Sequence, residues 1–323
     1  MTVGVNISHD SSICIKKEEH IEFFEESRFN KNKYWEPTPE YFDYVSFNKI
    51  QNFSDTFVFS SYGRENNNDE KIINNICKKY KIQNFVFNSF MHHIYHAFAG
   101  FYLSPFEEAF CIVIDGGGAT FPNKETFQET DSIYHMNKSS IDTKYKSYSN
   151  ARSSTLWSTF YDKDKLIKLT ESINNNLSKD VLNNFYFTEE GVEYRMTHSY
   201  NPGLLFNHLC ATTNLWQETN GVIYAEAGKA MGLSSYGNNY GKRDEDLAKQ
   251  VQEATEKYTI ELIEKALNYG NIKNIVLSGG YALNCVNNYK YTQYFKDVNF
   301  FIDPCAHDGG TSLGAVLWYD NYR

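Results

Sequence analysis

The sequence predicts an α/β protein, and three observations support this class. Three short apolar runs, VGVNI, FCIVI and IKNIVL, each end in a turn of small or polar residues, as buried strands of α/β sheets do. An amphipathic helical pattern covers Asp244 to Asn268 and leads into the third run. The 323 residues are 41% hydrophobic and 22% charged with only 6 Pro, which fits one large or two intimate domains whose core requires no disulfide or metal.

The three apolar runs are predicted to be strands whose carboxyl ends carry the chemistry. Their turns are chemically alike although they lie far apart in the chain: SHDSS at 8–12, DGGGAT at 115–120 and SGGYALN at 278–284. Ligands of α/β proteins usually bind beyond the carboxyl ends of the strands. We therefore expect the three turns to converge on one ligand.

The rest of the chain supplies further helices, a hairpin and an insertion. Apolar spacing predicts helices near 203–215 and 310–319, and alternation on both sides of NKSS predicts a hairpin over 131–150. The segment 151–195 is rich in Asn, Lys and Ser and contains the helical pattern KDKLIKLTESINNNL. We predict that it is a peripheral insertion.

Charge and targeting patterns disfavour several classes of protein. The chain has 31 Lys and Arg against 40 Asp and Glu, a formal net charge of -9, which disfavours a broad nucleic-acid surface but leaves room for a local basic groove. The six cysteines are scattered without a CxxC pair, as in a reducing cytosol. No signal-peptide pattern and no apolar run of about 18 to 20 residues occurs, so we expect a soluble cytoplasmic protein without a membrane partner.

The motif MHHIYHA presents a candidate metal site. His92 and His96 are four residues apart, so on a helix their Cβ atoms lie about 5–6 Å apart on one face. Two imidazoles at this spacing suit one divalent cation, whereas His93 points elsewhere on the helix. Helical histidines are also often solvated or buried without a metal, so this interpretation requires a third ligand.

Asp308 in the motif DPCAHDGGTS is the candidate third ligand. It stands at the end of a predicted strand and just before a helix that starts with two glycines. The alternative is that Asp308 only caps this helix. The neighbouring His307 competes with it as a ligand.

Two glycine-containing turns are candidate phosphate sites. In the first, the Asp115 carboxylate can hold a metal or a ribose, and the N–H groups of three following glycines can approach phosphate oxygens; these are Gly116, Gly117 and Gly118. In the second, Gly279 and Gly280 precede a predicted helix N-terminus that favours an anion, and Asn284 belongs to the same motif. Neither turn matches GxGxxG or the P-loop pattern, which disfavours Rossmann and P-loop proteins.

The turn after the first strand contains a candidate general base. His9 and Asp10 stand there with the hydroxyls of Ser11 and Ser12 beside them, and a histidine can take a proton near neutral pH. The alternative is a turn that Asp and Ser side chains stabilise.

Two further segments carry cations that phosphate could meet. Arg28, Lys31 and Lys33 lie in ESRFNKNKY, although such a charge run is normally solvated. The run YAEAGKAMG holds Glu226 and Lys229 among small residues, a composition typical of a helix packed closely on a ligand or a sheet.

Taken in order along nearly the whole chain, these motifs resemble the O-carbamoyltransferases of the NodU and TobZ type. That family is related to the Kae1/TsaD proteins and to the carbamoyl-transfer domain of HypF. The resemblance implies a single Kae1-like domain with an ASKHA (actin and sugar-kinase-like) fold of two RNase-H-like lobes and a nucleotide between them. Lobe I would comprise about 1–108 with the helix 309–323, and lobe II about 109–308 with the insertion 151–195.

The resemblance also implies roles for the residues singled out above. His92, His96 and Asp308 match iron ligands, while Asp115 and its glycines match a nucleotide contact. His9 falls in an HDxS motif beside the acceptor, where a base is needed, and Lys31 or Lys33 would neutralise phosphate. The implied cofactors are Fe²⁺ or another divalent metal and ATP or carbamoyl-adenylate, with carbamoyl phosphate as the ultimate carbamoyl donor.

The implied reaction moves a carbamoyl group onto a hydroxyl of a small molecule or a modified nucleobase. One alternative is an enzyme like the tRNA threonylcarbamoyl transferases, which the acidic balance disfavours. Another is a non-catalytic ATP-binding ASKHA regulator, which would not need His9 together with the three metal ligands.

The sequence also departs from the family pattern. Family members commonly continue into a YrdC-like domain that makes the adenylate, and the 323 residues contain none. We expect that a separate YrdC-like protein supplies the adenylate, that this domain uses carbamoyl phosphate itself, or that activity has been lost. The usual EGK reads AEAGK, ERF reads SRF and SLG reads SYNPG, which weakens the assignment of roles to Glu226 and Arg28.

Overall fold

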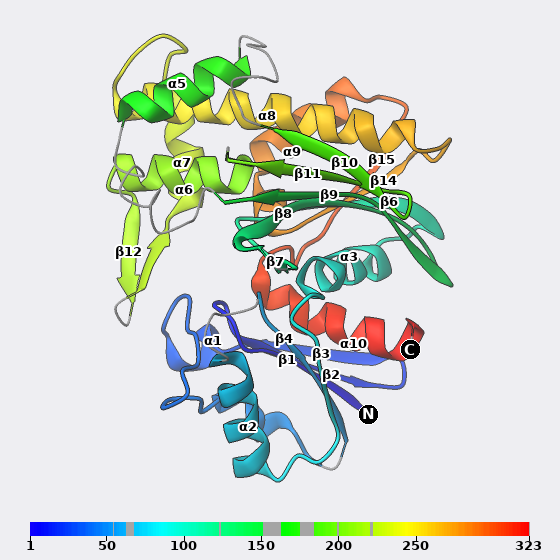
Figure 1. Cartoon of the computed structure of the whole chain (residues 1–323). Coiled ribbons are helices and arrows are strands. Elements are labelled where there is room, and N and C mark those ends of the chain that lie inside the picture. The colour runs from blue at the N-terminus through cyan, green and yellow to red at the C-terminus, as the bar shows by residue number, and fades with distance from the viewer. Residues whose placement is uncertain are drawn as a thin grey trace.

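Two β-sheets face each other across a pair of helices. The computed structural model describes residues 1–53, 55–62, 68–122, 124–150, 163–174, 184–198, 200–219 and 222–322. Within these residues, helices α3 (His92–Leu103) and α10 (Thr311–Tyr322) pack against each other between the sheets (Figure 1). Helix α10 lies on the first sheet and α3 on the second. The two helices therefore join the two halves of the molecule.

The first sheet is built from the N-terminal part of the chain. Its order is β3 (His20–Glu25), β2 (Ser12–Lys17), β1 (Thr2–Asn6), β4 (Thr56–Ser60) and β5 (Phe85–Phe87). The first three strands form an antiparallel meander, and β4 and β5 are parallel to β1. Gly4 lets α10 approach this sheet, because a Cβ there would lie 1.9 Å from the carbonyl oxygen of Ser312. Helix α2 (Asn68–Tyr80) contributes Ile72 and Ile76 to the core beside the sheet.

The second sheet has eight strands. Seven of them run in the order β10 (Phe185–Glu189), β11 (Val192–Thr197), β9 (Ser140–Ser149), β8 (Lys124–Asn137), β6 (Glu108–Ile114), β14 (Asn274–Ser278) and β15 (Asn299–Ile302), and β7 (Thr120–Phe121) pairs with β8. Strands β6, β14 and β15 are parallel. Because β6 and β14 are parallel neighbours, their carboxyl ends lie at the same end of the sheet. The two glycine turns, which follow these strands, therefore lie side by side.

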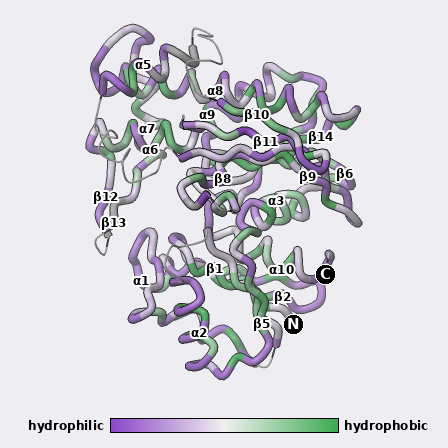
Figure 2. Tube along the Cα trace, viewed as in Figure 1, coloured by the Kyte–Doolittle hydropathy of each residue, from purple (hydrophilic) through white to green (hydrophobic). Residues whose placement is uncertain are grey.

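Both faces of the central strands are buried, as the apolar runs predict. Cys111 and Val113 of β6 belong to the same core cluster as Phe101 of α3. Ile112 and Ile114, on the opposite face, pack with α6 (Pro202–Thr212) and α8 (Asp244–Asn268). Each fully buried side chain of this size contributes about 1.5–3 kcal/mol to stability. In Figure 2 the hydrophobic colouring is clear in α3 and in β5.

The predicted secondary structure is largely confirmed. The three apolar runs form β1, β6 and β14, and the helical patterns form α6, α8 and α10. Strands β8 and β9 form the predicted hairpin. Strand β1 lies in the first sheet and the other two in the second, so the three turns meet because the sheets face each other.

The segment 151–195 is only partly peripheral. Its helix α5 (Lys163–Asn174) packs on α8, but β10 and β11 extend the second sheet, with β11 parallel to β9. The Asn, Lys and Ser content of the segment gave no indication of these strands. Strand β11 is hydrogen-bonded to β9, and β10 to β11. The stretches 151–162 and 175–183 lie outside the described residues.

The remaining elements are short. They are α1 (Ser27–Asn30), the two-stranded sheet of β12 (Trp216–Thr219) and β13 (Val222–Ala225), α7 (Ala227–Leu233) and α9 (Cys285–Tyr294). Among the described residues, we find no helix with the length and apolar character needed to cross a membrane.

Candidate metal centre

Helix α3 presents its two candidate ligand histidines from its first turns. His92 and His96 are both fully buried, and their ring centroids lie 4.8 Å apart with the planes at 85°. The spacing of four residues therefore brings both rings to one side of the helix. The neighbouring His93 faces elsewhere, because its Nδ1 lies 2.9 Å from the hydroxyl of Ser132 on β8.

Two carboxylates complete this group. Nε2 of His92 lies 3.3 Å from Oδ2 of Asp115 and 3.8 Å from Oδ1 of Asp308. Nε2 of His96 lies 3.8 Å from the same Asp308 oxygen. One ligand atom from each of the four residues lies within 4.8 Å of the others, and all four residues are buried. Asp115, which the sequence predicts to hold a metal or a ribose, thus lies with the candidate metal ligands.

The chemistry of this group fits a divalent cation. Two imidazoles and two carboxylates are a donor set that Fe²⁺, Zn²⁺ and similar ions accept. Within the described part of the chain, Nε2 of His96 and Nδ1 of His92 have no hydrogen-bond partner. Buried polar atoms without a partner are rare and need an explanation. A cation held between the histidines and the carboxylates would give Nε2 of His96 the partner it lacks.

The protein around Asp115 fixes its position. Its carbonyl oxygen accepts a hydrogen bond of 2.5 Å from Nδ2 of Asn201, and its Oδ1 accepts one of 3.3 Å from the N–H of Gly280. Asn201 is also the N-cap of α6, with its side-chain oxygen accepting from the N–H of Leu204. The Asn-Pro pair at a helix start is a sequence signal for this cap, but it does not by itself indicate the contact with Asp115.

Asp308 is not the cap of the helix that follows it. It begins the 3-10 turn Asp308–Gly310, and the cap is His307, whose Nδ1 accepts a hydrogen bond of 3.1 Å from the N–H of Gly309. The other ring nitrogen of His307 lies 2.9 Å from Glu25, so His307 is engaged outside the cluster of four ligands. The Asp308 carboxylate is therefore free of the capping bond and faces His92 and His96.

Both carboxylates are held in their ionised form. Burial opposes the charge of Asp115, but the hydrogen bond to His92 and the nearby charges of His92 and His96 keep its pKa well below the usual range. Burial likewise opposes the charge of Asp308, and the positive charges of His9 and His92 lower its pKa by more. A carboxylate binds a metal in this ionised form.

His9 adjoins the centre on the side of Asp308. Its Nε2 lies 3.1 Å from Oδ2 of Asp308 and its Nδ1 lies 3.0 Å from Oδ2 of Asp10. Burial alone would lower the pKa of His9, but the two carboxylates raise it to about 10. The two carboxylates thus favour the protonated form of His9, whereas the base role predicted for it requires an unprotonated Nε2.

The glycine turns lie against the centre. A Cβ on Gly118 would lie 2.8 Å from the ring of His93 and 3.3 Å from that of His92. Gly279 has a φ of +85°, and a Cβ there would meet the backbone of Ile114. The first turn, Gly116 to Gly118, and the second, Gly279 and Gly280, are thus neighbours, joined through the contact of Gly280 with Asp115.

Asn284 serves the structure itself. It is the N-cap of α9 and accepts a hydrogen bond of 3.2 Å from the N–H of Asn287. Its amide also pairs with that of Gln252, with a donor–acceptor distance of 2.9 Å from Gln252 Nε2. The side chain that we predicted as a nucleotide contact is thus engaged within the fold.

The predicted phosphate-binding cations have other partners or lie at the surface. Nζ of Lys33 lies 3.0 Å from the Glu226 carboxylate. Burial lowers the pKa of Lys33, but its bonds with Tyr34 and Glu226 raise it by more. Arg28 pairs with Glu25 at 2.9 Å, and Lys31 is exposed.

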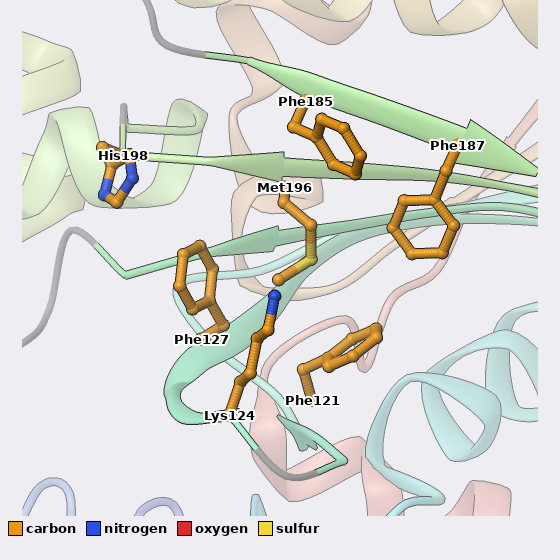
Figure 3. A pocket seen from close by; sticks show the side chains of 7 residues that line it. All are labelled: Phe121, Lys124, Phe127, Phe185, Phe187, Met196 and His198. Atoms are coloured by element: carbon orange, nitrogen blue, oxygen red, sulfur yellow. The ribbon is translucent and has the colours of Figure 1, made fainter.

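A small aromatic pocket lies elsewhere on the second sheet (Figure 3). It is lined by Phe121, Lys124, Phe127, Phe185, Phe187, Met196 and His198, with a volume of about 230 Å³. None of the residues that we predicted for metal, nucleotide or catalysis lines it.

The protein thus has a mixed α/β fold, and two buried histidines and two buried carboxylates lie together beside the carboxyl end of β6. A family model described as "Carbamoyltransferase N-terminus" matches residues 18–317. The chain belongs to this carbamoyltransferase family, as its motifs predict.

Individual relatives agree with this membership. The chain is 26% identical over 245 residues to the nodulation protein NolNO of Sinorhizobium fredii, covering 71% of this chain and 31% of the relative. It is 28% identical to an uncharacterized protein of Methanocaldococcus jannaschii, covering 98% and 57%. The chain thus spans less than two thirds of either relative.

Solved structures of HypF share the fold. Full-length HypF in its phosphate- and nucleotide-bound form matches with a TM-score of 0.57 at 12% identity, over 99% of this chain and 55% of that one. HypF of T. kodakarensis matches with a TM-score of 0.60, also at 12% identity, over 99% and 48%. At this identity the likeness concerns the fold alone.

Proposed function

We propose that this chain is an O-carbamoyltransferase that depends on a divalent metal and a nucleotide. It transfers the carbamoyl group of carbamoyl-adenylate, or of carbamoyl phosphate used with ATP, to a hydroxyl group. The observation that carries the proposal is the buried cluster of His92, His96, Asp115 and Asp308, with His9 beside it, in a chain of the carbamoyltransferase family.

The architecture supports an ASKHA fold of two RNase-H-like lobes. The first sheet combines a three-stranded meander with two parallel strands in the order β3-β2-β1-β4-β5. The second sheet likewise places the hairpin β8–β9 beside the parallel strands β6, β14 and β15. Each sheet carries one helix of the central pair, α10 or α3. In such a fold the nucleotide lies between the two halves, where the glycine turns meet.

In the proposed reaction, the oxygen of an acceptor hydroxyl attacks the carbamoyl carbon. The bond between that carbon and the phosphate oxygen breaks, AMP leaves with the bond's electron pair, and the hydroxyl proton passes to a base. The atoms and charges of this step balance, and it requires no oxidant or reductant. A divalent metal held by the four ligands would supply electrophilic stabilisation of the carbonyl or phosphate oxygen.

The chain's own residues have separate tasks in this scheme. The N–H groups of Gly116 and Gly117 would bind the phosphate, because glycine permits close approach of the backbone. The N–H of Gly118, also predicted to contact the nucleotide, instead donates a hydrogen bond of 2.6 Å to the carbonyl oxygen of Glu129. The contact of Gly280 with Asp115 holds the two glycine turns together. His9, whose Nε2 lies 3.1 Å from Oδ2 of Asp308, receives the acceptor proton once its own Nε2 is unprotonated.

The test supplies the purified protein with each donor. Carbamoyl-adenylate, and separately carbamoyl phosphate with ATP, are incubated with a panel of hydroxyl acceptors and with Fe²⁺, Mn²⁺ or Zn²⁺, and products are identified by mass spectrometry. We expect metal-dependent release of AMP and a carbamoylated acceptor. The variants His92→Ala and Asp308→Ala should lose both metal binding and transfer.

A matched control separates the site from general effects of losing a histidine. His20 is exposed at the start of β3, so His20→Ala should retain metal and activity. Full metal binding and full transfer in the variant that lacks both His92 and Asp308 would refute the site. If neither donor is consumed by the metal-loaded protein, the proposed activity is wrong.

A further inference from the structure

A second group of buried charges lies where β8 meets α3, beside the metal centre. Its central residue is Glu129 of β8, which is fully buried. Nζ of Lys146 on β9 lies 2.9 Å from Oε1 of Glu129, and the hydroxyl of Ser132 donates a hydrogen bond of 2.6 Å to the same oxygen. A buried ion pair adds little net stability, because both charges lose their contact with water. The pair therefore calls for an explanation in terms of what it holds in place.

Ser132 connects Glu129 with His93 on α3. A serine hydroxyl has one hydrogen to donate, and Ser132 donates it to Glu129. The Ser132 oxygen therefore accepts the hydrogen of Nδ1 of His93, which lies 2.9 Å away. The same Nδ1 lies 3.6 Å from Oε1 of Glu129. These contacts hold the imidazole of His93 toward β8, with its hydrogen on Nδ1 and a lone pair on Nε2.

The main chain of Glu129 is anchored to the first glycine turn. Its carbonyl oxygen accepts a hydrogen bond of 2.6 Å from the N–H of Gly118, and its N–H donates one of 2.8 Å to the carbonyl oxygen of Ala119. This turn begins at Asp115, one of the candidate ligands. Glu129 therefore joins the turn to the side chain that follows His92 on α3.

His93 is close enough to compete with the two candidate ligand histidines. Its ring centroid lies 5.9 Å from that of His92 and 6.5 Å from that of His96. Among the described residues, its Nε2 has no hydrogen-bond partner, and an unprotonated imidazole nitrogen is a good ligand for divalent cations. Three neighbouring imidazoles can bind a cation in more than one combination. A centre that uses only His92 and His96 therefore requires a restraint on His93.

We propose that Glu129, acting through Ser132, is a positioning residue that keeps His93 out of the metal centre and so limits the centre to two histidine ligands. The inference rests on the proposed function, because it concerns the metal centre of that function. Groups beyond the direct ligands commonly orient metal-binding side chains. Without the restraint, the imidazole of His93 turns about its side-chain bonds and Nε2 becomes a third nitrogen ligand. A merely structural Glu129 would affect stability and leave the coordination unchanged.

The test counts the histidines on the metal, with Co²⁺ as the probe and with the full chain free of donor and acceptor. Each histidine that coordinates high-spin Co²⁺ gives a strongly shifted, exchangeable ring N–H signal in the proton NMR spectrum. The unmodified protein should give two such signals. Ser132→Ala should give three, because Nδ1 of His93 loses the oxygen that holds it.

A double substitution tests Glu129 itself. Glu129→Met together with Lys146→Met replaces the buried ion pair with apolar side chains, so that no unpaired charge remains buried. The Ser132 hydroxyl then lacks the acceptor that orients it, and the third signal should appear here as well. Adding His93→Leu to Ser132→Ala removes the competing ring and should return the count to two.

Ser46→Ala is the matched control. Ser46 lies in the 3-10 turn Val45–Lys49 and is fully buried, and its hydroxyl donates to the carboxylate of Glu26, which is also fully buried. Its loss should lower stability and leave two signals. Melting curves verify that each variant is folded. Two signals in folded Ser132→Ala or in the double variant, three signals in Ser46→Ala, or three signals after removal of His93 would overturn the inference.

The proposed function is judged separately, from AMP release by the unmodified protein. If the protein cleaves the donor but Ser132→Ala leaves the histidine count unchanged, the positioning role is wrong and the transferase stands. If the count changes as expected but neither donor is cleaved, the positioning role stands and the proposed reaction is wrong.

Discussion

Gly118 offers a sharp test of how the fold holds the metal ligands. In Gly118→Ala the new Cβ would lie 2.8 Å from Cδ2 and 2.9 Å from Nε2 of His93, and 3.3 Å from Cδ2 of His92. Both histidine rings are fully buried, and His93 is tied to Ser132. The rings therefore have little room to retreat, and His92 must move with the helix that carries it.

Overpacking of this kind costs about 1–3 kcal/mol of stability. Because 1 kcal/mol shifts the melting temperature of a large domain by about 2–4 °C, we expect a fall of about 2–12 °C. Displacing a ligand through its neighbour typically weakens metal binding by about 10- to 100-fold. Metal affinity is measured by competition with a fluorescent chelator, and stability by calorimetry.

Gly228→Ala is the control for this experiment. Gly228 lies in α7, and a Cβ there meets no atom within 4 Å. Alanine in a helix is favoured over glycine, so this variant should be more stable by about 0.4–1 kcal/mol and bind metal normally. If Gly118→Ala binds metal as tightly as the unmodified protein and melts at the same temperature, packing against this turn does not hold the ligands.

Three further predictions follow from other contacts. Asn201→Ala removes a helix cap and a hydrogen bond to the Asp115 carbonyl, and it should lower the free energy of unfolding, measured in urea, by about 2–4 kcal/mol. As a control, Asn299→Ala at an exposed position should change this free energy by no more than about 0.5 kcal/mol. Burial opposes protonation of His92, but the charges of Asp308 and Asp115 raise its pKa by more, so metal affinity should fall as the pH is lowered, because His92 must lose its proton to bind a metal; a pH-independent affinity would contradict ligation by His92. The hydrogen bond with Arg243 lowers the pKa of Asp246 to about 2 from an ordinary 3.8, so its stabilising contribution is complete above about pH 4 and lost as the pH falls to about 2. The melting temperature of the unmodified protein should therefore fall more steeply over that range than that of Asp246→Asn, and parallel curves would refute this.

Periodicity alone predicted elements whose pattern is long or strongly apolar. Helix α8 begins and ends where its amphipathic repeat does, and β6 and β14 coincide with the apolar runs. Strands β10 and β11 were missed, because their residues are mixed in polarity and their pairing depends on the edge of β9. That edge is a tertiary feature, which local pattern does not contain.

The candidate site likewise combines local features, which the sequence predicts, with tertiary features, which it does not. The spacing of His92 and His96 is local, so a helix suffices to place them on one face. Whether Asp308 caps a helix or binds a metal depends on the groups that lie opposite its side chain in the folded protein, which the sequence does not show. In the structure the capping residue is His307. The environment of Glu129 is still less readable, because its partners Lys146 and His93 come from other segments that share no motif with it.

The route of the chain through the metal centre has a consequence for its biosynthesis. His92 and His96 are made early, whereas Asp308 is added roughly two hundred residues later. At about 5–20 residues per second, the two histidines wait about 10–40 s on the ribosome before the last carboxylate ligand exists. During synthesis the nascent chain therefore has at most an incomplete set of the proposed ligands, and capture of a metal by all four would be a late event that coincides with the arrival of α10 between the two sheets.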